Sequence, residues 1–240
     1  KKSIELIEFS RSNVNAASGR STFVAGQLNV YKSMVEFQYF YLHSPERAFD
    51  YSEKYRNREL LDLITQAQTT TWQEADQDLK LATSIKPKSL SEIQQALPAD
   101  VQLVEYALTE NQLLIWVVNR EHWLAENVPI TATRLQAMVS DYLQALRKRG
   151  ELTSLNSQSQ ELYRLLIQPV ARHLQPQQNL VIVPDGALNS LPFVSLFNPD
   201  SGHYLVEEHA LSISPSANVL ARLLKKSLAS KTKPVRSVLA

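Results

Sequence analysis

The sequence predicts an α/β protein in which antiparallel helical hairpins come before a layered α/β domain. Through the first part of the chain, apolar side chains recur three, four or seven residues apart, as on one face of a helix. From Val101 onward, short β-rich runs alternate with amphipathic segments, an order typical of a layered α/β domain. The change in pattern falls at Lys86–Ser89, which we interpret as the boundary between the two parts.

Two successive helices are predicted in the first part. The second begins at Ser44, whose hydroxyl can cap a helix, and Pro45, which needs no amide donor there, and it runs over Glu46–Ile64. Because only a few residues around His43 connect the helices, they should be antiparallel neighbours. The Gln-rich segment Thr65–Lys80 is either an exposed helix or a mobile connector. The apolar stripe of the first helix consists of Phe23, Val24, Leu28, Tyr31, Met34, Val35 and Leu42.

The second part opens with a short helix and a β-hairpin. Ser89 and Glu92 have the spacing of a capping box, and the proline after Leu97 ends the helix. The runs Val101–Tyr106 and Leu113–Val118 are rich in β-branched and aromatic residues and are separated by a short polar segment. This arrangement predicts two strands joined by a turn of several residues.

Helices and buried strands alternate in the remainder. An amphipathic helix is predicted over Thr133–Arg149, with Gly150 as its C-cap. A second helix is predicted over Gln160–Leu174, with Pro169 kinking or restarting it. The later elements are the strands Leu180–Val183 and Ala210–Ile213 and the helix Ala217–Ser227.

Composition excludes several classes of function. The formal net charge is +1, so no overall charge favours nucleic acid or a membrane surface. The five glycines form no phosphate-binding loop and no dinucleotide motif. The absence of cysteine excludes a disulfide framework, a thiolate metal site and a cysteine nucleophile within this chain. The chain has no apolar run of about 18 residues and no signal-peptide core, it lacks an initiator Met, and it ends on apolar residues, so we expect a piece of a longer cytoplasmic protein.

Few residues in the sequence qualify as candidates for a site. Asp185, in Pro184-Asp185-Gly186, could be a catalytic carboxylate at the end of a strand. The turn interpretation is stronger, because proline presets the turn, aspartate bonds the turn backbone and glycine takes positive φ. Leu191-Pro192-Phe193 is interpreted as an apolar anchor, and His122 and His209 as structural or exposed. The aromatic cluster of Phe37, Tyr39, Phe40 and Tyr41 is either a recognition surface or helix packing, and packing explains most of it.

An ordered series of segments resembles the CHAT domain, the caspase-like domain found behind tetratricopeptide repeats. The longest is Leu162–Leu220, which combines a helix, a buried strand, the Pro-Asp-Gly turn and the Leu-Pro-Phe anchor. Upstream, Ala48–Glu53 and Arg56–Leu63 look like the terminal helix of the preceding repeats. The start of the domain and its first strands are similar at Ser89–Gln94, Leu97-Pro98, Val104–Ala107 and Leu114–Val118.

The resemblance implies that residues 1–85 are tetratricopeptide-like repeats with a connector. Residues 86–240 would then be the inactive leading half of a caspase-like CHAT domain. The family's His-Gly motif and its catalytic cysteine follow later strands, and neither motif occurs here. Arg236–Ala240 would be the first strand of the active half. No catalytic, cofactor-binding or metal-binding residue can be assigned in this chain, and no cofactor is expected.

Two functions remain open at this point. The chain is either the regulatory and structural front part of a caspase-like cysteine endopeptidase or a non-catalytic protein-interaction scaffold with a CHAT-like body. The expected partners are a protein bound by the helical repeats and the downstream active half of the same protein. Neither a membrane nor a nucleic acid is expected as a partner.

Overall fold

The computed structural model describes residues 30–67, 87–149, 151–176 and 178–231. The chain divides into two compact units between Pro87 and Lys88, within the segment interpreted as a boundary. Several sequence-based predictions lie outside the described residues. They are the part of the apolar stripe before residue 30, the connector from residue 68 to residue 80, the C-cap at Gly150 and the strand Arg236–Ala240.

Within its described residues, the first unit contains two helical segments. Residues 30–36 form an α-helix that widens into the π-helical turn η1 (Phe37–Tyr41), and α3 (Pro45–Ala67) follows. The helix predicted from Ser44-Pro45 is therefore confirmed. His43 adopts a φ of 46°, in the left-handed region, where the chain reverses between the segments. Their packed residues are Tyr31, Val35, Ala48 and Phe49, each of which is buried.

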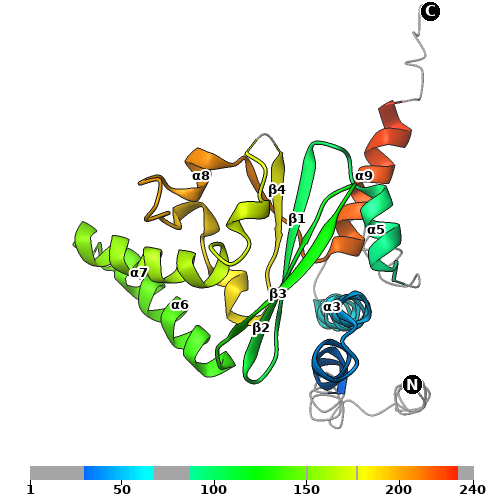
Figure 1. Cartoon of the computed structure of the whole chain (residues 1–240), viewed down its shortest axis with the longest axis horizontal. Coiled ribbons are helices and arrows are strands. Elements are labelled where there is room, and N and C mark those ends of the chain that lie inside the picture. The colour runs from blue at the N-terminus through cyan, green and yellow to red at the C-terminus, as the bar shows by residue number, and fades with distance from the viewer. Residues whose placement is uncertain (1–29, 68–86, 150, 177, 232–240) are drawn as a thin grey trace, which may run out of the picture. The chain divides into compact units, whose positions relative to one another are not determined.

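The second unit is built on a five-stranded mixed sheet in the order β3-β2-β1-β4-β5 (Figure 1). An antiparallel meander of β1, β2 and β3 forms one side, and β4 and β5 continue from β1 in parallel. The bounds are Val101–Leu108 for β1, Gln112–Val118 for β2, Trp123–Pro129 for β3, Asn179–Val183 for β4 and Leu211–Ile213 for β5. The α/β fold class and the predicted β-hairpin of β1 and β2 are thus confirmed.

Strand β3 was not predicted from the sequence. It includes Glu126, Asn127 and Pro129, residue types that are depleted in strands. They are tolerated because β3 is an edge strand that pairs only with β2 among the described strands, and its side chains are half-buried or exposed. Pairing with β2, rather than intrinsic propensity, produces this strand.

Most helices of the second unit begin within one residue of the position that the sequence predicts. In α5 (Leu90–Ala96), both reciprocal bonds of the predicted Ser89–Glu92 capping box are present. The helix α6 (Ala132–Arg147) begins one residue before the prediction, because the Thr131 side chain caps it by accepting from the Arg134 amide. α8 (Leu205–Glu208) is short, and α9 (Ala217–Lys231) begins where predicted and runs past Ser227.

The helix predicted over Gln160–Leu174 is displaced. The observed α7 spans Leu152–Leu166, so the prediction was wrong at both ends. At the start, Leu152 and Leu155 are followed only by polar residues up to Gln160, so the helical pattern of apolar side chains is weak there. At the end, Pro169 has no amide donor and disfavours helical backbone at Gln168. The chain turns there and forms the short 3-10 helix η2 (Ala171–His173).

Helices cover both faces of the sheet in this unit. Figure 1 shows α6, α7 and α8 on one face and α5 and α9 on the other. Alternate residues such as Val104 and Tyr106 of β1 face the α6–α7 side and join its core, while every β1 side chain is buried. The Tyr106 hydroxyl donates to the Leu166 carbonyl at the end of α7 (2.9 Å). Burial raises the pKa of Tyr106, so this hydroxyl stays protonated as the donor.

Candidate functional site

In an open α/β sheet, ligands usually bind at the carboxyl ends of the parallel strands. There, Asp185 is buried, and its Oδ2 accepts a 2.7 Å hydrogen bond from the Leu108 amide at the end of β1. Gly186 follows with a φ of 55°, as the turn interpretation predicts. The Asp185 side chain was expected to accept a hydrogen bond from the backbone of its own turn, but it accepts one from the neighbouring strand β1. Asp185 therefore joins the ends of β1 and β4.

A second polar cluster holds the segment after this turn. The Tyr142 hydroxyl on α6 lies 2.9 Å from Ser195 Oγ, and the Ser159 hydroxyl on α7 donates to the Ser195 carbonyl at 2.7 Å. Ser159 Oγ also accepts from the Phe197 amide at 2.7 Å. Phe193, from the predicted Leu-Pro-Phe anchor, lies buried 5.7 Å from the Tyr106 ring. Ser159 and Ser195 have a structural role, because the hydroxyl of each forms hydrogen bonds with backbone groups.

No histidine in the described segments has a side chain hydrogen-bonded to a serine, threonine or tyrosine hydroxyl. His173 accepts from Arg172 Nε at 2.9 Å, and His203 lies 3.8 Å from the Glu207 carboxylate. His122 is exposed on the turn between β2 and β3. The nucleophile–base contact that acyl-transfer catalysis requires is therefore absent from the part of the chain that the structure describes.

His209 is buried beside the end of α8. Within the described residues its Nδ1 has no hydrogen-bond partner. Burial lowers the pKa of His209 from its ordinary value, and the charge of Glu208 partly offsets that effect. The imidazole is therefore held preferentially in its neutral form, in agreement with a structural role.

The described residues were compared with two further kinds of feature, a cluster of metal ligands and a membrane-spanning helix. They contain no group of three or more histidine, aspartate or glutamate side chains placed to share a metal ion. None of the helices that the structure describes combines the length and apolar character needed to cross a bilayer.

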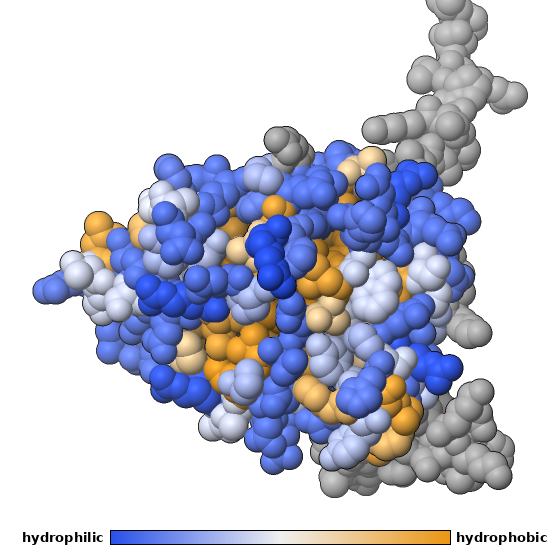
Figure 2. Space-filling view, viewed as in Figure 1, coloured by the Kyte–Doolittle hydropathy of each residue, from blue (hydrophilic) through white to orange (hydrophobic). Residues whose placement is uncertain are grey.

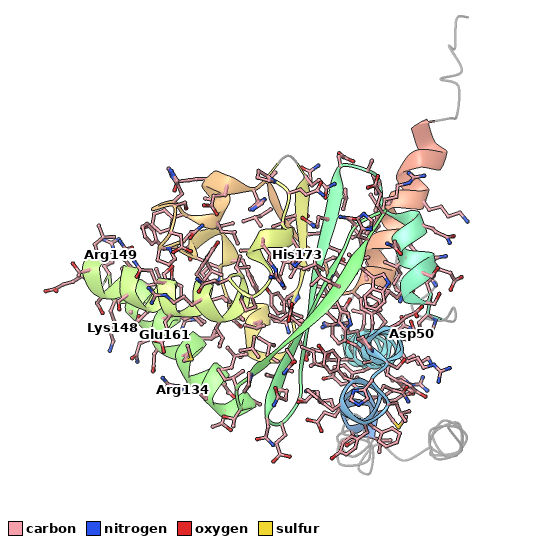
Figure 3. The ribbon with its side chains drawn as sticks, in the orientation of Figure 1. Asp50, Arg134, Lys148, Arg149, Glu161 and His173 are labelled. Carbon is pink, nitrogen blue, oxygen red and sulfur yellow. The ribbon has the colours of Figure 1, made fainter. Side chains whose placement is uncertain are left out.

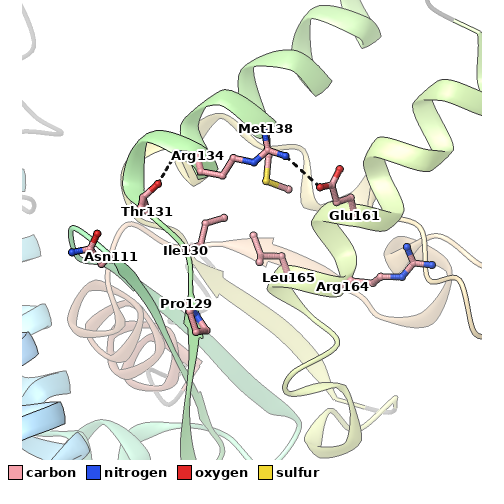
Figure 4. Close-up of a pocket in the computed structure, with 9 residues that line it drawn as sticks. All are labelled: Asn111, Pro129, Ile130, Thr131, Arg134, Met138, Glu161, Arg164 and Leu165. Atoms are coloured by element: carbon pink, nitrogen blue, oxygen red, sulfur yellow. Dashed lines mark hydrogen bonds and ion pairs between the residues drawn. The ribbon is translucent and has the colours of Figure 1, made fainter.

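A shallow cavity of about 660 Å³ lies between α6, α7 and the end of β3 (Figure 4). Its apolar lining consists of Pro129, Ile130, Met138 and Leu165. Figure 2 shows apolar side chains recessed among polar ones on the face of the molecule that carries the α6–α7 hairpin. The cavity therefore offers apolar surface that is surrounded by polar and charged groups.

Arginine and glutamate side chains border the cavity. Arg134 Nη2 lies 3.7 Å from Glu161 Oε1, and both side chains are more than half exposed. Such an ion pair contributes little to stability, because water screens it. Arg164 lies at the outer margin, one helical turn after Glu161 (Figure 4). Figure 3 shows that Arg134 and Glu161 lie at the opposite end of the α6–α7 hairpin from Lys148 and Arg149.

None of these cavity residues was predicted from the sequence. Arg134 with Met138, and Glu161 with Leu165, have the four-residue spacing of one helix face. That signal was visible for α6. It was visible for α7 as well, since Glu161 and Leu165 both lie within the helix that was predicted over Gln160–Leu174. Which helix faces which is a property of the tertiary packing.

The mixed α/β sheet with helices on both faces is consistent with a caspase-like fold. Residues 156–239 match the family model described as the CHAT domain. The chain thus carries a CHAT domain, a caspase-like family, and the resemblance noted in Leu162–Leu220 is confirmed. No curated protein matches the chain.

Proposed function

We propose that this chain is the regulatory and structural front part of a caspase-like cysteine endopeptidase. In this proposal, residues 1–85 are tetratricopeptide-like repeats that bind a protein partner. Residues 86–240 are the leading, inactive half of the CHAT domain. The catalytic histidine and cysteine belong to a downstream half of the same protein.

The observation that carries the proposal is a CHAT match in a chain that contains no cysteine. Peptide cleavage by a caspase-like protein needs a thiolate activated by a base. Here Asp185, after β4, and the Ser195 hydroxyl, in the segment that follows, form hydrogen bonds with backbone groups instead. The chain therefore supplies a scaffold and leaves the chemistry to other residues.

The topology of the sheet supports a division into two halves. The connections from β1 to β4 and from β4 to β5 pass over the α6–α7 face, whereas α9 leaves on the opposite face (Figure 1). Crossover connections between parallel strands are right-handed in nearly all proteins. A right-handed connection through α9 would lead back across the sheet and not beyond β5. In this proposal, the strand predicted at Arg236–Ala240 does not extend the sheet beyond β5 and starts a second sheet, which would be that of the active half.

The alternative function is a protein-interaction scaffold with a CHAT-like body that is never active. The hydrogen-bonded serines and His209, whose Nδ1 has no partner in the described residues, are as compatible with this role as with the first. The alternatives differ only in whether the longer protein keeps the Cys–His pair.

The test is to assay the full-length protein and the 240-residue chain against a mixture of fluorogenic peptides. We expect turnover, and labelling by iodoacetamide, only for the full-length protein. Replacement of the single downstream cysteine that iodoacetamide labels should abolish turnover. A full-length protein without turnover in the presence of its bound partner would favour the scaffold. Turnover by the 240-residue chain would contradict both functions.

A further inference from the structure

The outer edge of β3 carries backbone groups that no strand in the described residues uses. Bonds from the Asn119 amide to the His122 carbonyl (2.9 Å) and from the Ile130 amide to the Asn111 carbonyl (3.2 Å) define the phase of the β2–β3 ladder. In an antiparallel ladder, hydrogen-bonded and non-bonded pairs alternate. The even-numbered residues of β3 consequently bond to β2, and Ala125 and Asn127 direct their amides and carbonyls outward.

The cavity lies at the end of this edge. Pro129 and Ile130, which end β3 and follow it, line the cavity together with Met138 and Leu165 from the helices. Leu124 and Val128 of β3 point to the same side of the sheet, where they pack against the core. An extended chain paired with β3 would direct every second side chain to that side as well. One of those side chains would reach the cavity.

The charges around the cavity favour an acidic ligand. Two arginines and one glutamate border it, and Arg134 and Glu161 face each other. Arg164 is exposed and pairs with no carboxylate among the described residues. The margin therefore keeps one guanidinium available for a carboxylate, with which arginine forms charge-assisted hydrogen bonds. The methionine in the lining adapts readily to apolar side chains of different shapes.

We propose that the β3 edge and this cavity together bind an extended segment of a partner protein. The bound segment adds a strand to the sheet at β3 and inserts a bulky aliphatic or aromatic side chain between Ile130, Met138 and Leu165. An aspartate or glutamate next to that side chain pairs with Arg164. This recognition mode takes affinity from main-chain hydrogen bonds and specificity from the pocket. The site is separate from the helical repeats and does not depend on peptidase activity.

The experiment is a selection of random 12-residue peptides displayed on phage against the full 240-residue chain. We expect enrichment of sequences in which a bulky apolar residue neighbours an acidic residue. The strongest binder, labelled with fluorescein, is then measured by anisotropy. Arg164→Glu should weaken binding by about tenfold or more. Arg147→Glu makes the same charge change at the far end of the α6–α7 hairpin and should change the affinity less than about twofold.

Strand addition is tested with two versions of that peptide, N-methylated at alternate positions. Only the version whose methyl groups replace the amides facing β3 should lose binding, and equal effects of the two versions would overturn strand addition. A selection without enrichment, or a peptide that binds the Arg164→Glu chain as tightly as the wild type, would overturn the site. Equally tight binding of N-acetyl-leucine would assign the cavity to a small carboxylate instead of a partner protein.

Discussion

The parallel and antiparallel sides of the sheet are held in different ways. On the parallel side, buried polar groups join successive elements: Asp185 bonds the end of β1, and Ser159 and Tyr142 hold Ser195. On the antiparallel side, β3 is held by its ladder with β2 and by partly buried side chains. Glu126 of β3 also forms a solvent-exposed ion pair with Arg172, in which Oε1 and Nη2 lie 3.7 Å apart.

This difference separates a structural region from a region that is available for binding. A buried polar group left without its bond costs about 1–3 kcal/mol, so the parallel side has little freedom to rearrange. The outward backbone groups of β3 are near solvent and bear no such cost. We therefore expect substitutions on the parallel side to change stability, and substitutions along the β3 edge to change binding.

The largest expected effect is that of Phe193→Ala. Phe193 is fully buried against Tyr106, and removal of a buried phenylalanine side chain leaves a cavity that costs about 3–5 kcal/mol. Leu124→Ala, on the half-buried β3, should cost about 1 kcal/mol. Urea unfolding followed by tryptophan fluorescence measures both free energies. Equal losses in the two variants would contradict the comparison between the two sides.

Asp185→Ala should destabilise by about 1.5–3 kcal/mol, because the buried Leu108 amide loses a charged acceptor at 2.7 Å. Asp185→Asn is the matched control, since its side-chain carbonyl still accepts that bond, and its loss should be smaller. Glu126→Ala at the exposed pair should cost at most about 1 kcal/mol. The same urea titration provides all three values. A harmless Asp185→Ala substitution would show that the β1–β4 junction does not need this carboxylate.

Gly186→Val should destabilise by about 1–3 kcal/mol, because a β-branched residue is strained at a φ of 55°. The space itself is not limiting, since a Cβ built at this position meets Leu108 Cδ2 at an ordinary 3.5 Å. Gly186→Asn should therefore be tolerated better, as asparagine enters the left-handed region more readily. Thermal unfolding of the two variants separates backbone strain from crowding. A larger shift for asparagine than for valine would contradict this cause.

The smallest expected effect is a dependence of stability on pH that arises from His209. Since burial lowers the pKa of His209, protonation favours the unfolded chain. Its contribution is complete above the unfolded pKa of about 6.5 and is lost as the pH falls below that value. We expect the melting temperature to fall between pH 7.5 and pH 5.5, and His209→Gln to reduce that fall. An unchanged pH dependence in the variant would assign it to other groups.

Local sequence determined the elements whose signals lie within a few residues. The capping box at Ser89 and Glu92, the start of α3 at Pro45 and the strands β1 and β2 depend on propensity, capping and apolar runs. The order of segments within Leu162–Leu220 was likewise sufficient by itself to indicate the CHAT domain. The absence of cysteine, which limits the chemistry of this chain, is also a property of the sequence alone.

Tertiary structure decided the rest, because the deciding partners are far apart along the chain. The edge strand β3 exists through pairing with β2, against its own composition. The partner of Asp185 is the Leu108 amide, 77 residues away, which no local turn rule can predict. The cavity draws residues from a strand end and from two helices, and no local signal determines which faces of those helices meet. Long-range packing brings these groups together, so their chemistry appears only once the chain has folded.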